Sequence, residues 1–557
     1  MLKEEVLRIL SSVGVKCGID VLEIPAREEF GDVSFPCFSM AKEERKNPVE
    51  LATEISRKIQ ISRYPLIFKV EARGGYVNFF FYWEKIAELV LKSLFEQFKL
   101  KKDRVMVEYS QPNPVHSMHI GHARSTFLGD ALANLLSYVG CKVFRANYTN
   151  DVGLQVAKLV TAYKLWGKGE RPKGKSDLWL WHYYVKFHEK AKEDPSLEDK
   201  ARETLRKFEL EKDKRTIKLW KKVVGWCVKG FKETYKNVGV KFNVWFYESD
   251  FRDEGKEIVD KALLKGVAVK SPEGTIITNL KDYGLPDTVL LRSDGTGLYI
   301  TSDLALTVHK FEKYRLDSSV WVVMSHQDLY FKQLFKVLEL LEYKWAKNCY
   351  HFSYEPVKLA EGKMSSREGR AVMLDEVIKE LVRLAYDEVS KRNPKLARGD
   401  KLKIAKAVAV GALKYAILKV EPQDTITFDW KQMLSLEGNT APYIQYAHTR
   451  CAGILRKAKK WRRVVRIQKL DEEEKKLIKK LAEFHSVLEQ SVKDIKLHYI
   501  CNYAYELATT FNYFYERCPV LKCEENTKNF RLTLVEATKN VLKDCLKIMG
   551  VKPLERM

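Results

Sequence analysis

Residues 105–148, VMVEYSQPNPVHSMHIGHARSTFLGDALANLLSYVGCKVFRANY, contain the pattern that decides the fold. A buried strand (VMVEY) leads into a polar loop, then into a helical stretch that Gly140 ends, and then into a second strand, KVFRANY. Strands that alternate with helices predict a parallel, doubly wound sheet, whose ligands bind at the carboxyl ends of the strands. We therefore expect the loop at 108–124 to belong to a binding site.

That loop holds the sequence His119-Ile120-Gly121-His122 at the start of the predicted helix. The N–H groups of a helix N-terminus attract anions, and Gly121 allows a phosphate or ribose to come close. Two imidazoles in one helical turn can donate hydrogen bonds to phosphate oxygens and stabilise charge that develops there. The alternative is that both histidines are helix caps or surface residues. A metal site is not expected, because no acidic HExxH-type companion is present.

Three regions follow from the pattern outside this βαβ unit. Residues 1–99 read as a small α+β domain, and residues 100–400 as an α/β domain with a Lys- and Trp-rich helical insertion at about 160–240. The α/β pattern resumes by Val289, with a strand at 320–324 and a helix at 331–343. Residues 401–557 read as helix throughout.

The composition narrows the class of partner. The chain has 557 residues, of which 98 are Lys or Arg and 74 Asp or Glu, giving a net charge of +24. A surplus of this size favours a polyanion such as nucleic acid or an anionic membrane. The membrane is disfavoured because the longest apolar stretch, residues 404–420, contains three lysines, and the N-terminus lacks the apolar run of a signal peptide.

Ten scattered cysteines without a CxxC pair predict reduced thiols in a cytoplasmic protein and no zinc site.

A second candidate site is the segment EGKMSSREG at 361–369. Lys363, Ser365, Ser366 and Arg367 form a small polar loop between a strand-like segment and a predicted helix. Cations on such a loop can fold over a triphosphate and neutralise it in the transition state. The alternative interpretation is an ordinary charged turn.

Together these two segments resemble the paired HIGH and KMSKS signatures with which class I aminoacyl-tRNA synthetases act on ATP. The resemblance to the arginyl-tRNA synthetase family rests on further segments, and it extends from about residue 25 to the last residue. These segments are YSQPNP before HIGH, NYTNDVG at 147–153, YITSD at 299–303, SHQDLYFKQLFKVLELL at 325–341, FDWKQMLSLEGNTAPYIQYAHTR at 428–450 and the closing KPLERM.

The resemblance implies an arginine–tRNA ligase. Such an enzyme joins L-arginine to ATP, with Mg²⁺, and passes the arginyl group from the adenylate to the 3′ end of tRNA(Arg). It also implies a Rossmann-type catalytic domain at 100–400, an N-terminal tRNA-binding domain at 1–99 and an α-helical anticodon-binding domain at 401–557. The family is usually monomeric and usually needs tRNA before it activates arginine.

The resemblance also assigns site residues. The ATP-binding and catalytic groups are His119, Gly121, His122, Lys363, Ser365, Ser366 and Arg367. The arginine-binding residues are Glu108, Gln111, Pro112, Asn113, His122, Tyr299, Asp303 and Gln327. A guanidinium needs carboxylates and planar acceptors, and Asp303 is expected to be its main partner. Its alternative role is that of a helix N-cap. The family's second signature lysine is replaced by Ser366, and its usual substitute, a lysine three residues before HIGH, is here His116.

Candidate tRNA contacts lie in both flanking domains. They are Asn78, Phe81, Asn439, Tyr443, Arg450, Arg462, Arg463 and Tyr515. Stacking aromatics beside a cationic groove suit the splayed bases of an anticodon, although an aromatic stripe is more often core. The run from Arg456 to Arg466 has seven bases and no acid, and it is expected to contact phosphates.

Two other functions fit part of this pattern. A nucleotidyltransferase of the cytidylyltransferase kind shares the HxGH site but needs neither the helical C-terminal region nor a charge of +24. A non-catalytic RNA-binding paralogue would not need to retain both phosphate motifs and a guanidinium pocket.

Overall fold

The computed structural model describes residues 2–96, 98–358, 372–427 and 433–557. Its contacts divide the chain into two compact units, which are described separately below. The first unit consists of Met1–Glu96, Ile454–Ala482 and Asn512–Ala537, and the second of Gln97–Gly453, Glu483–Phe511 and Thr538–Met557.

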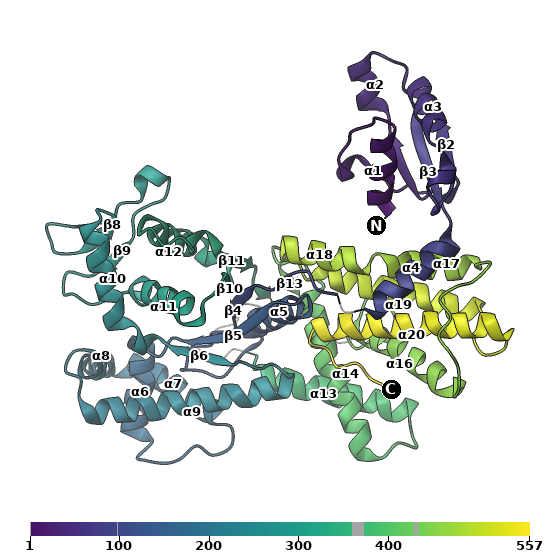
Figure 1. Cartoon of the computed structure of the whole chain (residues 1–557). Coiled ribbons are helices and arrows are strands. Elements are labelled where there is room, and N and C mark those ends of the chain that lie inside the picture. Colours follow the sequence, from purple (N-terminus) through teal and green to yellow (C-terminus); the bar gives the residue numbers. More distant parts are fainter. Residues whose placement is uncertain (1, 97, 359–371, 428–432) are drawn as a thin grey trace. The chain divides into compact units, whose positions relative to one another are not determined.

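The second unit is built on a five-stranded parallel sheet (Figure 1). In chain order its strands are β4 (Arg104–Glu108), β5 (Lys142–Thr149), β6 (Val244–Tyr247), β10 (Ser318–Met324) and β11 (Cys349–Tyr354). They lie in the order β11-β10-β4-β5-β6, so the chain leaves the central β4 first in one direction and later in the other. The predicted doubly wound sheet is confirmed, and its topological switch point lies between β4 and β10.

Helices connect these strands. The connecting helices are α5 (Ile120–Tyr138), α6 (Leu154–Trp166), α7 (Ser176–Glu193), α8 (Ser196–Glu209), α9 (Lys214–Val238), α10 (Arg252–Leu264), α11 (Tyr299–Tyr314) and α12 (Asp328–Leu340). The helical insertion predicted at 160–240 corresponds to α6–α9. A small antiparallel sheet was not predicted, because its strands have only three residues each, too few for an alternating pattern. They are β7 (Ala268–Lys270), β8 (Ile276–Thr278) and β9 (Val289–Leu291).

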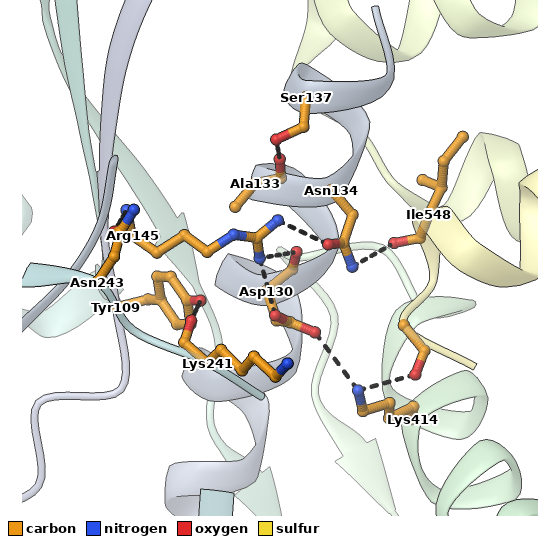
Figure 2. Close-up of polar contacts among 11 residues, drawn as sticks. Tyr109, Asp130, Ala133, Asn134, Ser137, Arg145, Lys241, Asn243, Lys414 and Ile548 are labelled. Atoms are coloured by element: carbon orange, nitrogen blue, oxygen red, sulfur yellow. Dashed lines mark hydrogen bonds and ion pairs between the residues drawn. The ribbon is translucent and has the colours of Figure 1, made fainter. Parts of the chain in front are cut away.

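Helix α5, which begins at the HIGH sequence, is fixed to its surroundings at its far end (Figure 2). Asp130 accepts from Arg145 of β5 at 3.0 Å and from the buried Lys414 at 3.4 Å. Asn134 accepts from Arg145 at 2.7 Å and donates to the carbonyl of Ile548 at 3.2 Å. Through Arg145 this network joins α5 to β5, and removal of one partner would leave a buried charge unpaired.

Beyond β11 the second unit is helical apart from a pairing of two short strands, β12 (Val357–Lys358) and β13 (Ile426–Thr427). Residues 401–557 were predicted to be all helix, and β13 is an exception. The helices after β11 are α13 (Leu374–Arg392), α14 (Arg398–Leu418), α16 (Ala441–Ala458), α17 (Glu472–Ala482), α18 (Phe484–Asp494), α19 (His498–Arg517) and α20 (Glu525–Ile548). Of these, α17 belongs to the first unit, and α16, α19 and α20 contribute residues to both units.

In the first unit, a three-stranded antiparallel sheet has the order β1-β3-β2. The strands are β1 (Val33–Pro36), β2 (Ile67–Arg73) and β3 (Tyr76–Phe81), and the N-terminal helices are α1 (Leu2–Ser12), α2 (Phe38–Glu44), α3 (Pro48–Lys58) and α4 (Trp83–Phe95). The α+β prediction for this region is confirmed.

Within the part of the chain that the structure describes, no helix has the length and apolar character needed to cross a membrane. All ten cysteines are free thiols.

Candidate active site

The two histidines of the HIGH sequence cap the helix that follows them. The Nδ1 atom of His119 accepts from the N–H of Gly121 at 3.1 Å, and that of His122 accepts from the N–H of His119 at 3.2 Å. A neutral imidazole whose Nδ1 accepts carries its proton on Nε2. Both rings therefore cap with one nitrogen and present an N–H donor with the other, so the cap role and the predicted phosphate role are compatible.

Burial keeps these rings neutral. It lowers the pKa of His119 to about 4 and holds the pKa of His122 well below its usual range, and the two ring centroids are 3.9 Å apart. The third ring is that of His116, which occupies the position of a lysine in the resemblance; burial lowers its pKa as well. Burial therefore favours the neutral form of His116.

The same three histidines have potential ligand atoms within 4.8 Å of one another. A metal bound at Nε2 would require the proton to move to Nδ1. In His119 and His122 that nitrogen already accepts a backbone N–H. The arrangement suits donation to an anion better than coordination of a cation.

A second cluster, the acidic cluster, consists of Glu108, Glu248 and Asp303. Glu108 ends β4 at the switch point and Asp303 lies one turn into α11, whereas Glu248 directly follows β6. The side chain of Glu248 is fully buried, and its Oε2 has no hydrogen-bond partner among the described residues. Glu108 is 3% exposed and forms an ion pair of 2.5 Å with the fully buried Lys310.

Burial disfavours the charged form of two carboxyl groups in the acidic cluster. Burial raises the pKa of Asp303 to about 6 although Tyr330 donates a hydrogen bond to it. Burial also raises the pKa of Glu248 to about 8, against the effect of Arg252, whose guanidinium lies 3.4 Å away. Carboxylates whose pKa values are raised in this way are stabilised by a cation that enters between them.

The loop after β4 has an unusual backbone. Ser110 and Gln111 have positive φ angles of 79° and 43°, which side-chain-bearing residues rarely adopt. Ser110 is held by hydroxyl contacts of 2.7 Å with Thr126 and with Tyr235 of α9. The turn directs the Gln111 amide to Glu108 at 3.0 Å.

The other predicted arginine-binding residues lie on segments around this cluster. Pro112 is buried and Asn113 exposed in the same loop, and Gln327 follows β10 on the opposite side of the switch point. Tyr299 begins α11 with 56% of its surface exposed, whereas Asp303, one turn further on, is directed inward to Tyr330. The predicted KMSKS-like residues Lys363, Ser365, Ser366 and Arg367 lie outside the described residues.

The predicted tRNA contacts differ in their accessibility. Asn78 and Phe81 lie in the central strand of the N-terminal sheet and are each 4% exposed, and Asn78 accepts from Ser34 at 2.5 Å. Side chains project from the faces of a sheet, so the burial of these two residues means that the faces of β3 are covered at both positions.

Two arginines of the basic run 456–466 form ion pairs within the protein. Arg463 donates to Glu536 at 2.6 and 2.8 Å and lies over the ring of Phe95, and Arg466 pairs with Glu88 at 2.7 Å. Arg462 is exposed and has no ion pair among the described residues.

The remaining candidates belong to the helical region. Asn439 accepts from Tyr415 and is partly buried, and Tyr443 contacts Tyr505 with 5.5 Å between ring centroids. Arg450 lies over the exposed ring of Tyr446 at 4.8 Å. Tyr515 has 41% of its surface exposed.

Sequence reasoning missed Glu248, Lys310, Tyr148 and Tyr330. Burial and the nearby carboxylates raise the pKa of both tyrosines well above its usual range. The tyrosines lie inside two of the quoted motifs, NYTNDVG and SHQDLYFKQ, so that a closer reading of those motifs could have included them. Glu248 and Lys310 stand in no motif, and only the fold brings them to the cluster.

The chain matches three family models. These are "tRNA synthetases class I (R), catalytic domain" over residues 85–430, "DALR anticodon binding domain" over 444–557 and "Arginyl tRNA synthetase N terminal domain" over 1–81. The arginine–tRNA ligase of Clostridium perfringens is 35% identical over 550 residues, 96% of each chain. The chain belongs to the arginyl-tRNA synthetase family.

Further comparisons agree with this membership. The arginine–tRNA ligase of Lactobacillus johnsonii is 36% identical over 543 residues, again 96% of each chain. The solved structure of Thermus thermophilus arginyl-tRNA synthetase has a TM-score of 0.83 and 27% identity, covering 100% of this chain and 99% of that one. The family has a class I synthetase catalytic domain, so the sheet and the HIGH turn described above are those of a tRNA ligase.

Proposed function

We propose that this arginine–tRNA ligase binds L-arginine in the acidic cluster and MgATP at the HIGH turn, and that it transfers the activated arginine to tRNA(Arg). The observation that carries the assignment is the cluster itself. Glu108, Glu248 and Asp303 converge at the carboxyl end of a doubly wound sheet, beside two neutral histidines that cap a helix. A cation site adjoining an anion site is what a substrate pair of guanidinium and triphosphate requires.

Asp303 and Glu248 are the proposed guanidinium partners, with the Tyr330 hydroxyl orienting Asp303. A guanidinium can donate to two acceptors in one plane, whereas an ammonium is a compact point charge that cannot bridge them in the same way. Lysine would leave a buried carboxylate oxygen unpaired, and such a loss discriminates strongly without editing. Lys310 balances Glu108, so that Glu108 shapes the site without adding a full uncompensated charge.

The α-amino and α-carboxylate groups of arginine are assigned to Asn113 and Gln327, with Gln111, Pro112, His122 and Tyr299 lining the approach. Asn113 and Gln327 support this because they follow the two strands that flank the switch point. In this position the α-carboxylate of arginine is directed to the α-phosphate of ATP.

In the first step, a carboxylate oxygen of arginine attacks the α-phosphorus and the bond to the bridging oxygen of pyrophosphate breaks. The Nε2–H groups of His119 and His122 donate to the phosphate oxygens, on which charge accumulates in the transition state. The resemblance assigns Lys363 and Arg367, with Ser365 and Ser366, to the β- and γ-phosphates, and Mg²⁺ enters bound to ATP. In the second step a terminal ribose hydroxyl of the tRNA attacks the arginyl carbonyl and AMP leaves.

The three regions receive separate roles. Residues 100–400 carry out both reactions, and residues 1–99 bind the tRNA. Within residues 401–557, the anticodon is assigned to Asn439, Tyr443, Arg450 and Tyr515, and a phosphate contact to Arg462. The free cysteines support action in the reducing cytoplasm, and the family supports a monomer.

Charging of tRNA(Arg) with labelled arginine tests the proposal. The purified chain is expected to form acid-precipitable arginyl-tRNA with ATP, and AMP and pyrophosphate in equal amounts. Formation of no arginyl-tRNA, or use of CTP in place of ATP, would overturn it.

A further inference from the structure

The exposed face of α9 carries a row of lysines with a glycine at its centre (Figure 1 labels the helix). Positions 214, 218, 221, 225, 229, 232 and 236 are separated by steps of three or four residues, which places them on one side of a helix. All are lysine except Gly225, and all are exposed. The six lysines, here called the lysine line, span about 33 Å at about 1.5 Å per residue.

The charge of the lysine line is uncompensated. None of the six lysines forms an ion pair with a carboxylate in the described ranges, and the exposed face of α9 holds a single acid, Glu233. Lys232 lies over the ring of Trp245 at 4.8 Å, which leaves its charge in place. A row of like charges creates a positive potential along the helix, which attracts a polyanionic partner.

Gly225 interrupts the line at its centre, and packing does not account for it. A Cβ atom added there would meet nothing within 4 Å, whereas at Gly230 of the same helix it would lie 2.1 Å from Asp177. Glycine is among the least favourable residues in a helix interior. Its presence at Gly225 therefore points to a partner that comes close to the helix backbone from outside.

The chemistry of α9 favours RNA over an anionic membrane. A helix that binds a membrane surface inserts exposed apolar side chains. Among the exposed large apolar residues of the chain none lies in α9, because Trp220, Val224 and Phe231 face the interior. Double-helical RNA is bound mainly through its phosphates and its shape, which exposed lysines at regular intervals can match.

Helix α9 also adjoins the active site. Its Tyr235 hydroxyl contacts Ser110 of the loop after β4 at 2.7 Å and accepts from Asn147 of β5 at 2.9 Å. An RNA helix lying along the outward face of α9 would thus have its end near that loop.

We propose that the lysine line of α9 binds the phosphate backbone of the helical tRNA arm that carries the 3′ end. This inference rests on the proposed function, and it gives the insertion at 160–240 a role in holding the arm whose terminus is aminoacylated.

The test compares two triple variants with equal changes in charge. Lys218→Gln/Lys221→Gln/Lys229→Gln removes three charges from the line. Lys265→Gln/Lys336→Gln/Lys391→Gln removes three lysines that are ion-paired on other elements of the same unit. The affinity for tRNA(Arg) is measured from 50 to 300 mM salt, with circular dichroism as the check on folding.

For the line variant, the slope of log affinity against log salt is expected to fall by about 2 to 3, since each lost phosphate contact contributes about 0.7–0.9. The control variant is expected to keep the wild-type slope. Equal slopes for the two variants would overturn the inference, as would lost binding to phosphatidylserine vesicles with unchanged binding to tRNA.

Gly225→Leu provides a second readout. It is expected to raise the thermal midpoint, because leucine is the better helix former, and yet to weaken tRNA binding about tenfold. A variant that is more stable and binds tRNA as well as wild type would contradict close approach at Gly225.

Charging of tRNA by the wild type separates the two proposals. Formation of no arginyl-tRNA would reject the proposed function, whereas normal charging with unchanged salt slopes would reject only the role of the lysine line.

Discussion

The HIGH turn and the acidic cluster lie at the same edge of the sheet but are assembled in opposite ways. His119, Gly121 and His122 are neighbours in sequence, and the hydrogen bonds that orient the rings are made within one helical turn. Glu108, Glu248 and Asp303 come from three segments, and Glu108 is paired to a lysine two hundred residues away in the chain.

This difference has an electrostatic counterpart. The HIGH turn is a neutral site that offers donors to an anion, because burial lowers the pKa of both rings. The acidic cluster is a site in which burial raises carboxylate pKa values, so a cation is needed to complete it. We therefore expect neutral polar substitutes in the HIGH turn to lower the rate only in part, whereas the acidic cluster depends on the charge of its carboxylates.

The largest effect is therefore expected at Asp303. Asp303→Asn removes the charge of a buried pair with the guanidinium, which costs about 2–5 kcal/mol and lowers arginine activation roughly 30- to 5,000-fold. ATP–pyrophosphate exchange measures the loss, and tRNA affinity serves as the control, since it should stay within about twofold. Asp303→Ala should abolish activation, and an active alanine variant would remove Asp303 from the site.

His119→Asn is the matched change in the HIGH turn. Asparagine keeps a side-chain acceptor for the helix cap but lacks the Nε2–H donor. The turnover number of exchange should fall about 10²-fold, as on loss of one donor to a transition-state oxyanion, with the KM for arginine unchanged. A raised arginine KM with normal turnover would assign His119 to the wrong substrate.

Arginine binding should release protons. In the empty site the pKa of Glu248 is about 8 and that of Asp303 about 6, and a guanidinium lowers both, so at pH 7 protons leave as arginine binds. The KM for arginine should accordingly fall as the pH rises from 6 to 8. Calorimetry in buffers of different ionisation enthalpy measures the release. Glu248→Gln should raise the KM about tenfold and remove most of the release; release at the wild-type level in that variant would exclude Glu248.

The smallest effects on tRNA binding are expected in the basic run at 456–466, where Arg462 and Arg463 are neighbours in sequence but differ in their ion pairs. Arg462→Gln should lower the salt slope of tRNA binding by about 0.7–0.9, as for one phosphate contact. Arg463→Gln should leave the slope unchanged and cost about 0.2–1 kcal/mol of stability, because Arg463 already pairs with Glu536 at the surface. Equal slope changes in the two variants would show that Glu536 releases Arg463 to the RNA.

Features made by residues that are close in sequence could be predicted, whereas features assembled from distant segments could not. The strand at 105–109, the helix after HIGH and the doubly wound order were predictable, because hydrophobic period and loop position are local properties. Glu248 and Lys310 were not predictable, because their roles arise from contacts that only the sheet order creates. The burial of Asn78 and Phe81 was not predictable for a related reason: a strand-like sequence does not reveal which faces of the strand other elements cover. Likewise, the many basic residues at 456–466 suggested unpaired charge, although two of them form ion pairs. The lysine line of α9 was not recognised, because its members are three or four residues apart in the sequence and meet only on the helix surface.

Selection of arginine over lysine by the acidic cluster is tested most directly by ATP–pyrophosphate exchange with each amino acid in the presence of tRNA(Arg). Exchange with arginine is expected to exceed that with lysine at least about 10⁴-fold, as for a site whose buried polar groups the wrong side chain leaves unpaired. Comparable exchange with lysine, or none with arginine, would contradict the account.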